Sequence, residues 1–210
     1  MKSKKDVKEI IKILKETYPE AECSLDFSNP FQMAVAVLLS AQCTDARVNI
    51  VTKELFKIAP TAEEMNKLTV KEIEKYISSC GLYKTKAKNI KGLAEMVMNT
   101  YNGEIPDTME ELMKLPGIGR KSANVVMLEA FHNPQGVAID THAKRICNRI
   151  GISKEESPEK IEQDLLKKID KDEYFDANHL CVWHGRYTCK ARKPECERCT
   201  IRKYCNYFKI

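Results

Sequence analysis

The sequence has no run of about 18 apolar residues, the length that a membrane-spanning helix needs. Lys12 and Lys15 interrupt the N-terminal stretch where a signal peptide would carry its apolar core. No segment shows the sustained alternation of apolar and polar residues typical of a β-strand, and no repeat or low-complexity tract is present. These absences exclude a membrane-embedded chain, a sheet-based fold and a repeat array. We therefore expect a cytoplasmic protein.

Helix signals fill most of the chain. Two capping boxes, in which a threonine precedes a glutamate by three residues, lie at 61–64 and 69–72. Asp140 marks another helix start, and Gly151 marks its end. We expect further starts at Asn29–Pro30, Thr44 or Asp45, Thr85, a Thr108–Glu111 capping box, Arg120 and Ser157–Pro158. About ten helices in 210 residues indicate an all-α protein with two lobes.

Positive charge is concentrated in two segments. The chain has a formal net charge of +5, but residues 114–149 alone carry six basic and two acidic side chains, and residues 186–205 carry seven and two. Residues 150–185 are acidic, with nine acidic and five basic side chains. Two separate basic segments are suited to holding a polyanion such as a nucleic acid. Chance fluctuation of charge along a chain is the alternative.

Residues 115–119, Leu-Pro-Gly-Ile-Gly, predict a tight turn between two helices. Gly117 and Gly119 leave backbone N–H groups uncovered where the second helix presents its positive end. Such a turn can bind a phosphate. Lys121 lies in the first turn of the following helix. From these residues alone, an ordinary helical corner with a solvated lysine is an equal alternative.

Four of the nine cysteines lie within 17 residues, with the spacing C-x6-C-x2-C-x5-C. In a cytoplasmic chain, four thiols this close predict a metal site rather than disulfides. Zinc and a 4Fe-4S cluster both accept four thiolates. From the residues alone zinc is slightly favoured, because C-x2-C knuckles are common in zinc sites, but the segment has only one such pair and both metals stay open. The site cysteines are Cys189, Cys196, Cys199 and Cys205. The other five, which we expect to be small buried side chains, are Cys23, Cys43, Cys80, Cys147 and Cys181.

Three motifs occur together and in order: LPGIGRKSANVV, AIDTHAKRICNRIG, and HGRYTC followed by the cysteine pattern. With them, the chain resembles the endonuclease III family of the helix-hairpin-helix DNA glycosylase superfamily over nearly its whole length. The resemblance implies a bifunctional DNA glycosylase and AP lyase, and it favours 4Fe-4S over zinc. It also implies a six-helix lobe over 23–132, with the hairpin at about 108–130. A cluster lobe would combine 1–22 with 133–210, and a DNA cleft would separate the lobes.

The resemblance assigns catalytic roles to two residues. Lys121 matches the family's nucleophile, whose amine forms a Schiff base with the deoxyribose. Asp140 matches the catalytic aspartate, which stabilises positive charge on the sugar or relays protons. Asp140 is also an excellent helix N-cap, and capping alone is the structural alternative. His142 is expected to pack locally rather than to act as an acid or base.

The resemblance also implies how the duplex is opened to expose a flipped base. Gln42 matches the position that fills the gap in the helix, and Leu82 matches the wedge inserted between bases. Other expected DNA contacts are Gly117, Gly119, Arg120, Lys144, Lys190 and Arg192. The lysines at 84, 86, 88 and 91 would reach phosphate or form a solvated face. Cys43 departs from the family pattern, where alanine is usual.

The expected partner is double-stranded DNA containing a damaged pyrimidine or an abasic site. We expect a monomer associated with the nucleoid and not with a membrane. Adenine- or thymine-mismatch glycosylases are alternatives, but these are expected to lack the nucleophilic lysine. A non-catalytic module that binds DNA through the hairpin and the cluster is the alternative from another class.

Overall fold

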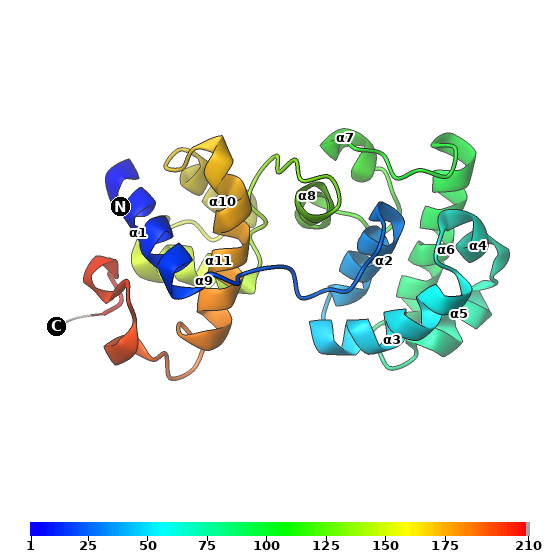
Figure 1. Cartoon of the computed structure of the whole chain (residues 1–210), viewed down its shortest axis with the longest axis horizontal. Coiled ribbons are helices and arrows are strands. Elements are labelled where there is room, and N and C mark those ends of the chain that lie inside the picture. Colours follow the sequence, from blue (N-terminus) through cyan, green and yellow to red (C-terminus); the bar gives the residue numbers. More distant parts are fainter. Residues whose placement is uncertain (209–210) are drawn as a thin grey trace. The chain divides into compact units, whose positions relative to one another are not determined.

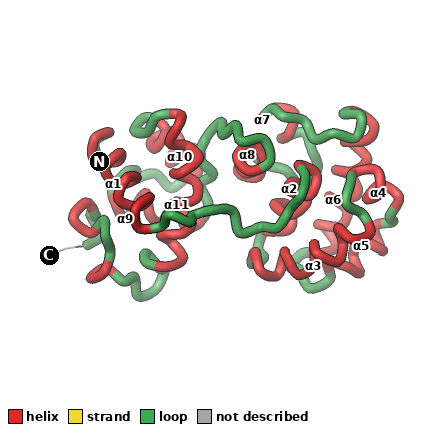
Figure 2. Tube along the Cα trace, in the orientation of Figure 1, coloured by secondary structure: helices red, strands yellow, loops and turns green. Residues whose placement is uncertain are grey.

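The computed structural model describes residues 1–208, and every regular element in that range is helical (Figures 1 and 2). This confirms the all-α prediction. The chain divides into two compact units, Ser24–Asn133 and Met1–Cys23 with Pro134–Ile210. Residues 209 and 210, the end of the expected cluster lobe, lie outside the described range. No described helix is long and apolar enough to cross a membrane.

The unit Ser24–Asn133 is built around one apolar helix, α2 (Pro30–Ser40). Its residues 31–39 are all buried, and it contacts α3, α6 and α8. The shorter helices α4 and α5 pack against α6. The other helices of this unit are α3 (Asp45–Ile58), α4 (Ala62–Lys67), α5 (Val70–Ile77), α6 (Tyr83–Thr100), the single turn α7 (Met109–Leu112) and α8 (Arg120–Glu129).

The second unit joins the two ends of the chain. The N-terminal helix α1 buries Val7, Ile10, Ile11 and Leu14, which lie on one face of the helix, in a core shared with the C-terminal helices. Because α1 contacts α11, the N-terminus is part of the cluster-bearing unit. The helices here are α1 (Lys4–Thr17), α9 (Thr141–Ile150), α10 (Pro158–Leu166) and α11 (Tyr174–Tyr187). Short 3₁₀ turns cover Lys171–Glu173, Cys196–Arg198 and Arg202–Tyr204.

Most predicted helix starts are confirmed, including both capping boxes, Asn29, Thr44, Asp140 and Ser157. Two details were wrong. The helix expected from Thr85 begins at Tyr83, because Leu82 serves as its N-cap and accepts the Lys86 N–H at 3.0 Å. The Thr108–Glu111 box is half formed. Thr108 accepts the Glu111 N–H, but the Glu111 carboxylate accepts hydrogen bonds from Tyr101 and Lys114 instead.

Candidate active site and iron–sulfur centre

The hairpin turn requires glycine at one position and leaves space at the other. Gly117 has φ +80°, and a Cβ there would lie 2.8 Å from Leu38 Cδ1 and 2.9 Å from Asn89 Nδ2. Gly119, the N-cap of α8, has φ −98° and ψ 179°, and no atom lies within 4 Å of the position its Cβ would take. Gly117 therefore serves the fold, whereas Gly119 leaves the N-terminal end of α8 uncovered.

Lys121 is exposed on the first turn of α8. Within residues 1–208 its amine makes no hydrogen bond or ion pair. The first N–H groups of any α-helix have no partner within the helix, and the start of α8 has no side-chain cap. The sequence therefore places an unengaged amine beside a group of N–H donors suited to a phosphate.

Asp140 is the N-cap of α9 in the other unit. Its Oδ1 accepts the Ala143 N–H at 2.7 Å, and the side chain is half-buried. The capping role predicted as its alternative is thus present, and it fixes the carboxylate at the helix start. His142 Nδ1 accepts a hydrogen bond from Arg145 at 3.1 Å, and His142 packs closely on Gly185, in line with the expectation of a local role.

Gln42 and Leu82 occupy two neighbouring turns. Both have left-handed backbone conformations, with φ 53° and φ 58°, which non-glycine residues rarely adopt. The Gln42 carbonyl oxygen lies 3.4 Å from the position of a Cβ on Gly81, so the two turns are in contact. Leu82 is 61% exposed, so it is not a core residue. Strain of this kind, about 1–3 kcal/mol for each residue, is often found at ligand-binding sites.

Lys86 is buried, contrary to the expectation of a phosphate contact or a solvated face. Its amine donates to the carbonyl oxygens of Leu39 at 2.9 Å and Ala41 at 2.7 Å, at the end of α2. Lys91 likewise donates to the backbone and side-chain oxygens of Asn66. Neither contact could be predicted from the sequence, because a lysine that donates to the backbone of a distant helix leaves no periodic pattern of residues. Lys86 fixes the turn that carries Gln42.

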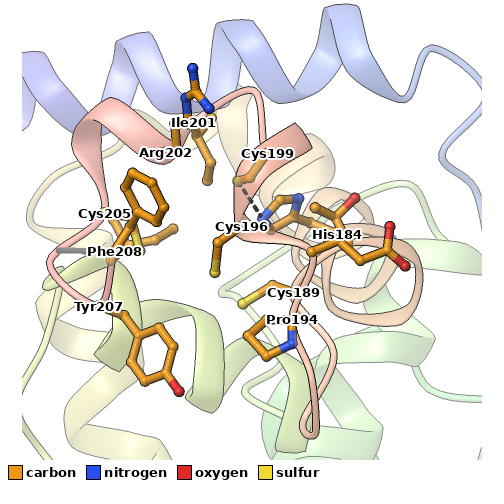
Figure 3. A pocket seen from close by; sticks show the side chains of 13 residues that line it. His184, Cys189, Pro194, Cys196, Cys199, Ile201, Arg202, Cys205, Tyr207 and Phe208 are labelled. Atoms are coloured by element: carbon orange, nitrogen blue, oxygen red, sulfur yellow. Dashed lines mark hydrogen bonds between the residues drawn. The ribbon is translucent and has the colours of Figure 1, made fainter. Parts of the chain in front are cut away.

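The four clustered cysteines line one cavity formed by residues 184–208 and Ile150 (Figure 3). Four thiols around one shared cavity fit a 4Fe-4S cluster, which takes four thiolate ligands. Burial raises the pKa of the Cys199 and Cys196 thiols, and the neighbouring cysteines raise it further. A positively charged iron core bound there would offset this cost.

Two side chains position the cluster loop. Arg149, in the last turn of α9, donates to the carbonyl oxygens of Lys190 at 2.8 Å and Ala191 at 3.0 Å, and its guanidinium lies 3.4 Å from Cys189 Sγ. His184 Nε2 lies 3.7 Å from Cys199 Sγ. Burial, followed by the nearby Arg145, lowers the pKa of His184 to about 4. Arg149 was missed from sequence, where it was indistinguishable from a helix-terminal cation.

The remaining residues predicted to contact DNA differ in whether their cation is already paired with a carboxylate. Lys144 pairs with the Glu156 carboxylate at 2.6 Å, and Lys190 pairs with Glu195 at 2.5 Å. Arg192 is exposed and makes no ion pair among the residues that the structure describes. Arg120 is exposed at the start of α8. Ion pairs on the surface contribute only about 0–1 kcal/mol, so a DNA phosphate can replace the carboxylate in each pair.

The hairpin fold and the cysteine site together define a class of DNA-repair protein. Residues 35–171 match the HhH-GPD superfamily of base excision DNA repair proteins. Residues 189–205 match the iron–sulfur binding domain of endonuclease III. The chain belongs to the endonuclease III family, a group of DNA glycosylases with AP lyase activity, and its cofactor is a 4Fe-4S cluster.

Relatives align over almost the whole chain. Endonuclease III of Synechocystis sp. (strain ATCC 27184 / PCC 6803 / Kazusa) is 46% identical over 98% of this chain and 94% of its own length. Two solved structures, a non-covalent endonuclease III–DNA complex and a trapped endonuclease III–DNA covalent intermediate, each superpose with a TM-score of 0.94. Both are 42% identical and cover 99% of this chain and 97% of the matched chain. These matches confirm the family that the three motifs indicated.

Proposed function

We propose that this protein removes oxidised or hydrated pyrimidines from duplex DNA and then cleaves the abasic site, with Lys121 as the nucleophile. The observation that carries the proposal is the exposed, unengaged amine of Lys121 at the uncapped start of α8. A similar endonuclease III has been trapped as a covalent intermediate with DNA. Covalent attachment requires a protein nucleophile, and an amine can both form and release such a bond.

The chemistry follows from an amine attacking the sugar. Lys121 Nζ bonds to C1′ while the bond from C1′ to the damaged base breaks and the base departs. Ring opening gives a protonated Schiff base, which acidifies the C2′ protons. Loss of one C2′ proton expels the 3′ phosphate by β-elimination, and water releases the lysine. A water nucleophile leaves no such electron sink, so excision and strand cleavage both depend on the amine.

Asp140 supports these steps in the proposal by stabilising the positive charge that develops on the sugar. Its Oδ1 accepts the Ala143 N–H, which holds the carboxylate in place at the start of α9. Because the cap needs only a side-chain oxygen acceptor, asparagine can preserve it while removing the charge. Asp140→Asn therefore separates the structural role from the catalytic one.

DNA binding in the proposal divides into phosphate contacts and base-stack contacts. The uncovered N–H groups near Gly119 bind a phosphate without reading sequence. Leu82, exposed on its strained turn, enters the base stack, and Gln42 fills the gap left by the flipped base. Arg120 and Arg192 add charge, and Lys144 and Lys190 exchange their surface carboxylate partners for phosphate. We further propose that the enzyme acts as a monomer on the nucleoid.

The iron–sulfur centre has a supporting role. The four residues that hold the cluster are Cys189, Cys196, Cys199 and Cys205. Arg149 donates hydrogen bonds to the backbone just after Cys189 and so holds the start of the cluster loop in place. When bound, the cluster supplies four iron–thiolate bonds that cross-link the 189–205 loop. This loop carries Arg192, so cross-linking presents that cation at a fixed position.

The test is a panel of duplexes containing thymine glycol, an A·G mismatch, a T·G mismatch or an abasic site. We expect excision of thymine glycol and cleavage of the abasic site by the wild-type holoprotein. Lys121→Gln should abolish both reactions, whereas Lys53→Gln, which changes another exposed lysine on α3, should leave them unchanged. Excision confined to a mismatch, or binding without any cleavage, would overturn the proposal in favour of a mismatch glycosylase or a binding module.

A further inference from the structure

A pair of cysteines outside the iron–sulfur centre joins the two strained turns. Cys43 directly follows Gln42, and Cys80 lies two residues before Leu82. The Gln42 carbonyl oxygen lies 3.4 Å from the position of a Cβ on Gly81, so the two turns are in contact, and the Cys43 side chain is close enough to raise the pKa of the Cys80 thiol. A disulfide between the two cysteines requires their sulfurs to reach the S–S bond length of about 2.05 Å.

The two thiols differ in access. Cys80 is only 2% exposed, whereas Cys43 is half-buried and open to small reagents. An external reagent therefore meets Cys43 first, and Cys80 lies beside it to complete the reaction. Burial, followed by the neighbouring Cys43 side chain, raises the pKa of Cys80 to about 11, while the cations of Lys86 and Arg47 act in the opposite direction. Closure by Cys80 is therefore expected to be slow.

A second pair of neighbouring cysteines outside the iron–sulfur centre serves as a comparison for Cys43 and Cys80. Cys147 and Cys181, in the other unit, form a second pair, in which the Cys147 side chain raises the pKa of the Cys181 thiol. Both are buried, at 0% and 8% exposure. Two pairs of neighbouring cysteines are thus present, and only the Cys43 pair includes a half-buried thiol.

We propose that Cys43 and Cys80 form a redox modification site, which a low-molecular-weight disulfide such as oxidised glutathione converts into an intramolecular disulfide that restrains the Gln42 and Leu82 turns. Cys43 first loses its proton to solvent, and its sulfur attacks the small disulfide. That S–S bond breaks, and one small thiolate leaves and is protonated. Cys80 then loses its proton and attacks the Cys43 sulfur, which expels the second small thiolate. Two cysteine thiols are oxidised, and one small disulfide is reduced to two thiols.

The consequence for DNA rests on the proposed roles of Gln42 and Leu82. Both residues must adjust as they enter the duplex, and a covalent link between their neighbouring residues removes that freedom. The disulfide is therefore expected to weaken binding to lesion-containing duplex by fivefold or more, about the lower limit of typical coupling between two linked events. Reduction by dithiothreitol restores binding.

The experiment treats the full-length holoprotein with oxidised glutathione and follows the visible absorbance of the cluster to show that it stays intact. Alkylation and peptide mass spectrometry locate any disulfide, and fluorescence anisotropy measures affinity for a thymine glycol duplex. We expect a Cys43–Cys80 link, reduced Cys147 and Cys181, and a reversible loss of affinity. Cys43→Ala should bind DNA normally before treatment and remain unaffected by it.

Absence of the Cys43–Cys80 link, a link without loss of affinity, or an equal loss in Cys43→Ala would each overturn the proposal. Cys80→Ser provides a second test, because it should stop at a mixed disulfide on Cys43. Borohydride trapping of the reduced wild-type protein is measured on the same sample. Failure of that trapping would overturn the proposed function, while the peptide map still decides whether the disulfide forms.

Discussion

Replacing each hairpin glycine by alanine should separate the fold from DNA binding. At Gly119, alanine meets no atom within 4 Å and adopts an ordinary extended backbone. Alanine is a poorer N-cap than glycine, at a cost of up to about 1 kcal/mol, but it also restricts the unfolded chain, which contributes about 0.4–1 kcal/mol in the opposite direction. The free energy of unfolding of Gly119→Ala should therefore lie within about 1 kcal/mol of wild type.

At Gly117, the same substitution is destabilising for two reasons, the backbone conformation and overpacking. The backbone has φ +80°, which costs an alanine about 1–2 kcal/mol. Its Cβ would lie 2.8 Å from Leu38 Cδ1 and 2.9 Å from Asn89 Nδ2, and relieving such overpacking costs about 1–3 kcal/mol. Gly117→Ala should therefore lose about 2–5 kcal/mol of stability. Urea denaturation followed by circular dichroism would measure the stability of both variants.

DNA affinity should show the complementary pattern for Gly119. A methyl group there occupies the space through which a phosphate approaches the first-turn N–H groups of α8. Loss of that contact should weaken binding about tenfold, equivalent to about 1.4 kcal/mol, and equally on damaged and undamaged duplexes. Fluorescence anisotropy at a fixed salt concentration measures this. Unchanged affinity in Gly119→Ala, or a stability loss as large as in Gly117→Ala, would refute the assignment of Gly119 to phosphate binding.

Three further predictions follow from other contacts. Lys86→Met should cost about 2–3 kcal/mol of stability, because the Leu39 and Ala41 carbonyl oxygens lose a charged donor; urea denaturation measures this, and an unchanged midpoint would contradict it. The Lys4 and Lys8 amines lower the pKa of Asp170 from 3.8 to about 2. A lowered pKa stabilises the fold above pH 3.8, and this contribution is lost as the pH falls towards 2, so Asp170→Asn should flatten that part of a stability–pH profile. Arg149→Met should lose its cluster absorbance faster than wild type under chelation, because the loop carbonyl oxygens lose their donor; equal rates would show that Arg149 does not hold the loop.

Local signals predicted most of the fold. Capping residues close short hydrogen-bonded loops within their own helix, so their effect can be seen in a few consecutive letters, as at Thr61, Thr69 and Asn29. The N-terminal helix buries Val7, Ile10, Ile11 and Leu14, whose spacing in the sequence is that of one face of an amphipathic helix. The start of α6 was placed two residues late, because Leu82 caps it through the backbone and carries no side-chain signature.

The candidate site was predictable only where chemistry lies within one motif. The hairpin glycines and the cysteine spacing are contiguous features, and the family motifs added Lys121 and Asp140. Contacts between distant segments were not predictable. Lys86 reaches back across 45 residues to Ala41, and Arg149 reaches forward across 41 to Lys190. No periodicity encodes such contacts, because they depend on how the helices pack.

The identity of the residue that bonds to DNA tests the central claim most directly. Borohydride reduction of the holoprotein with an abasic-site duplex, followed by nuclease and protease digestion, places the sugar remnant on one peptide by mass spectrometry. We predict that the remnant is attached to Lys121 Nζ. Attachment to another lysine or to the N-terminal amine, or the same yield of adduct from Lys121→Gln, would contradict the account.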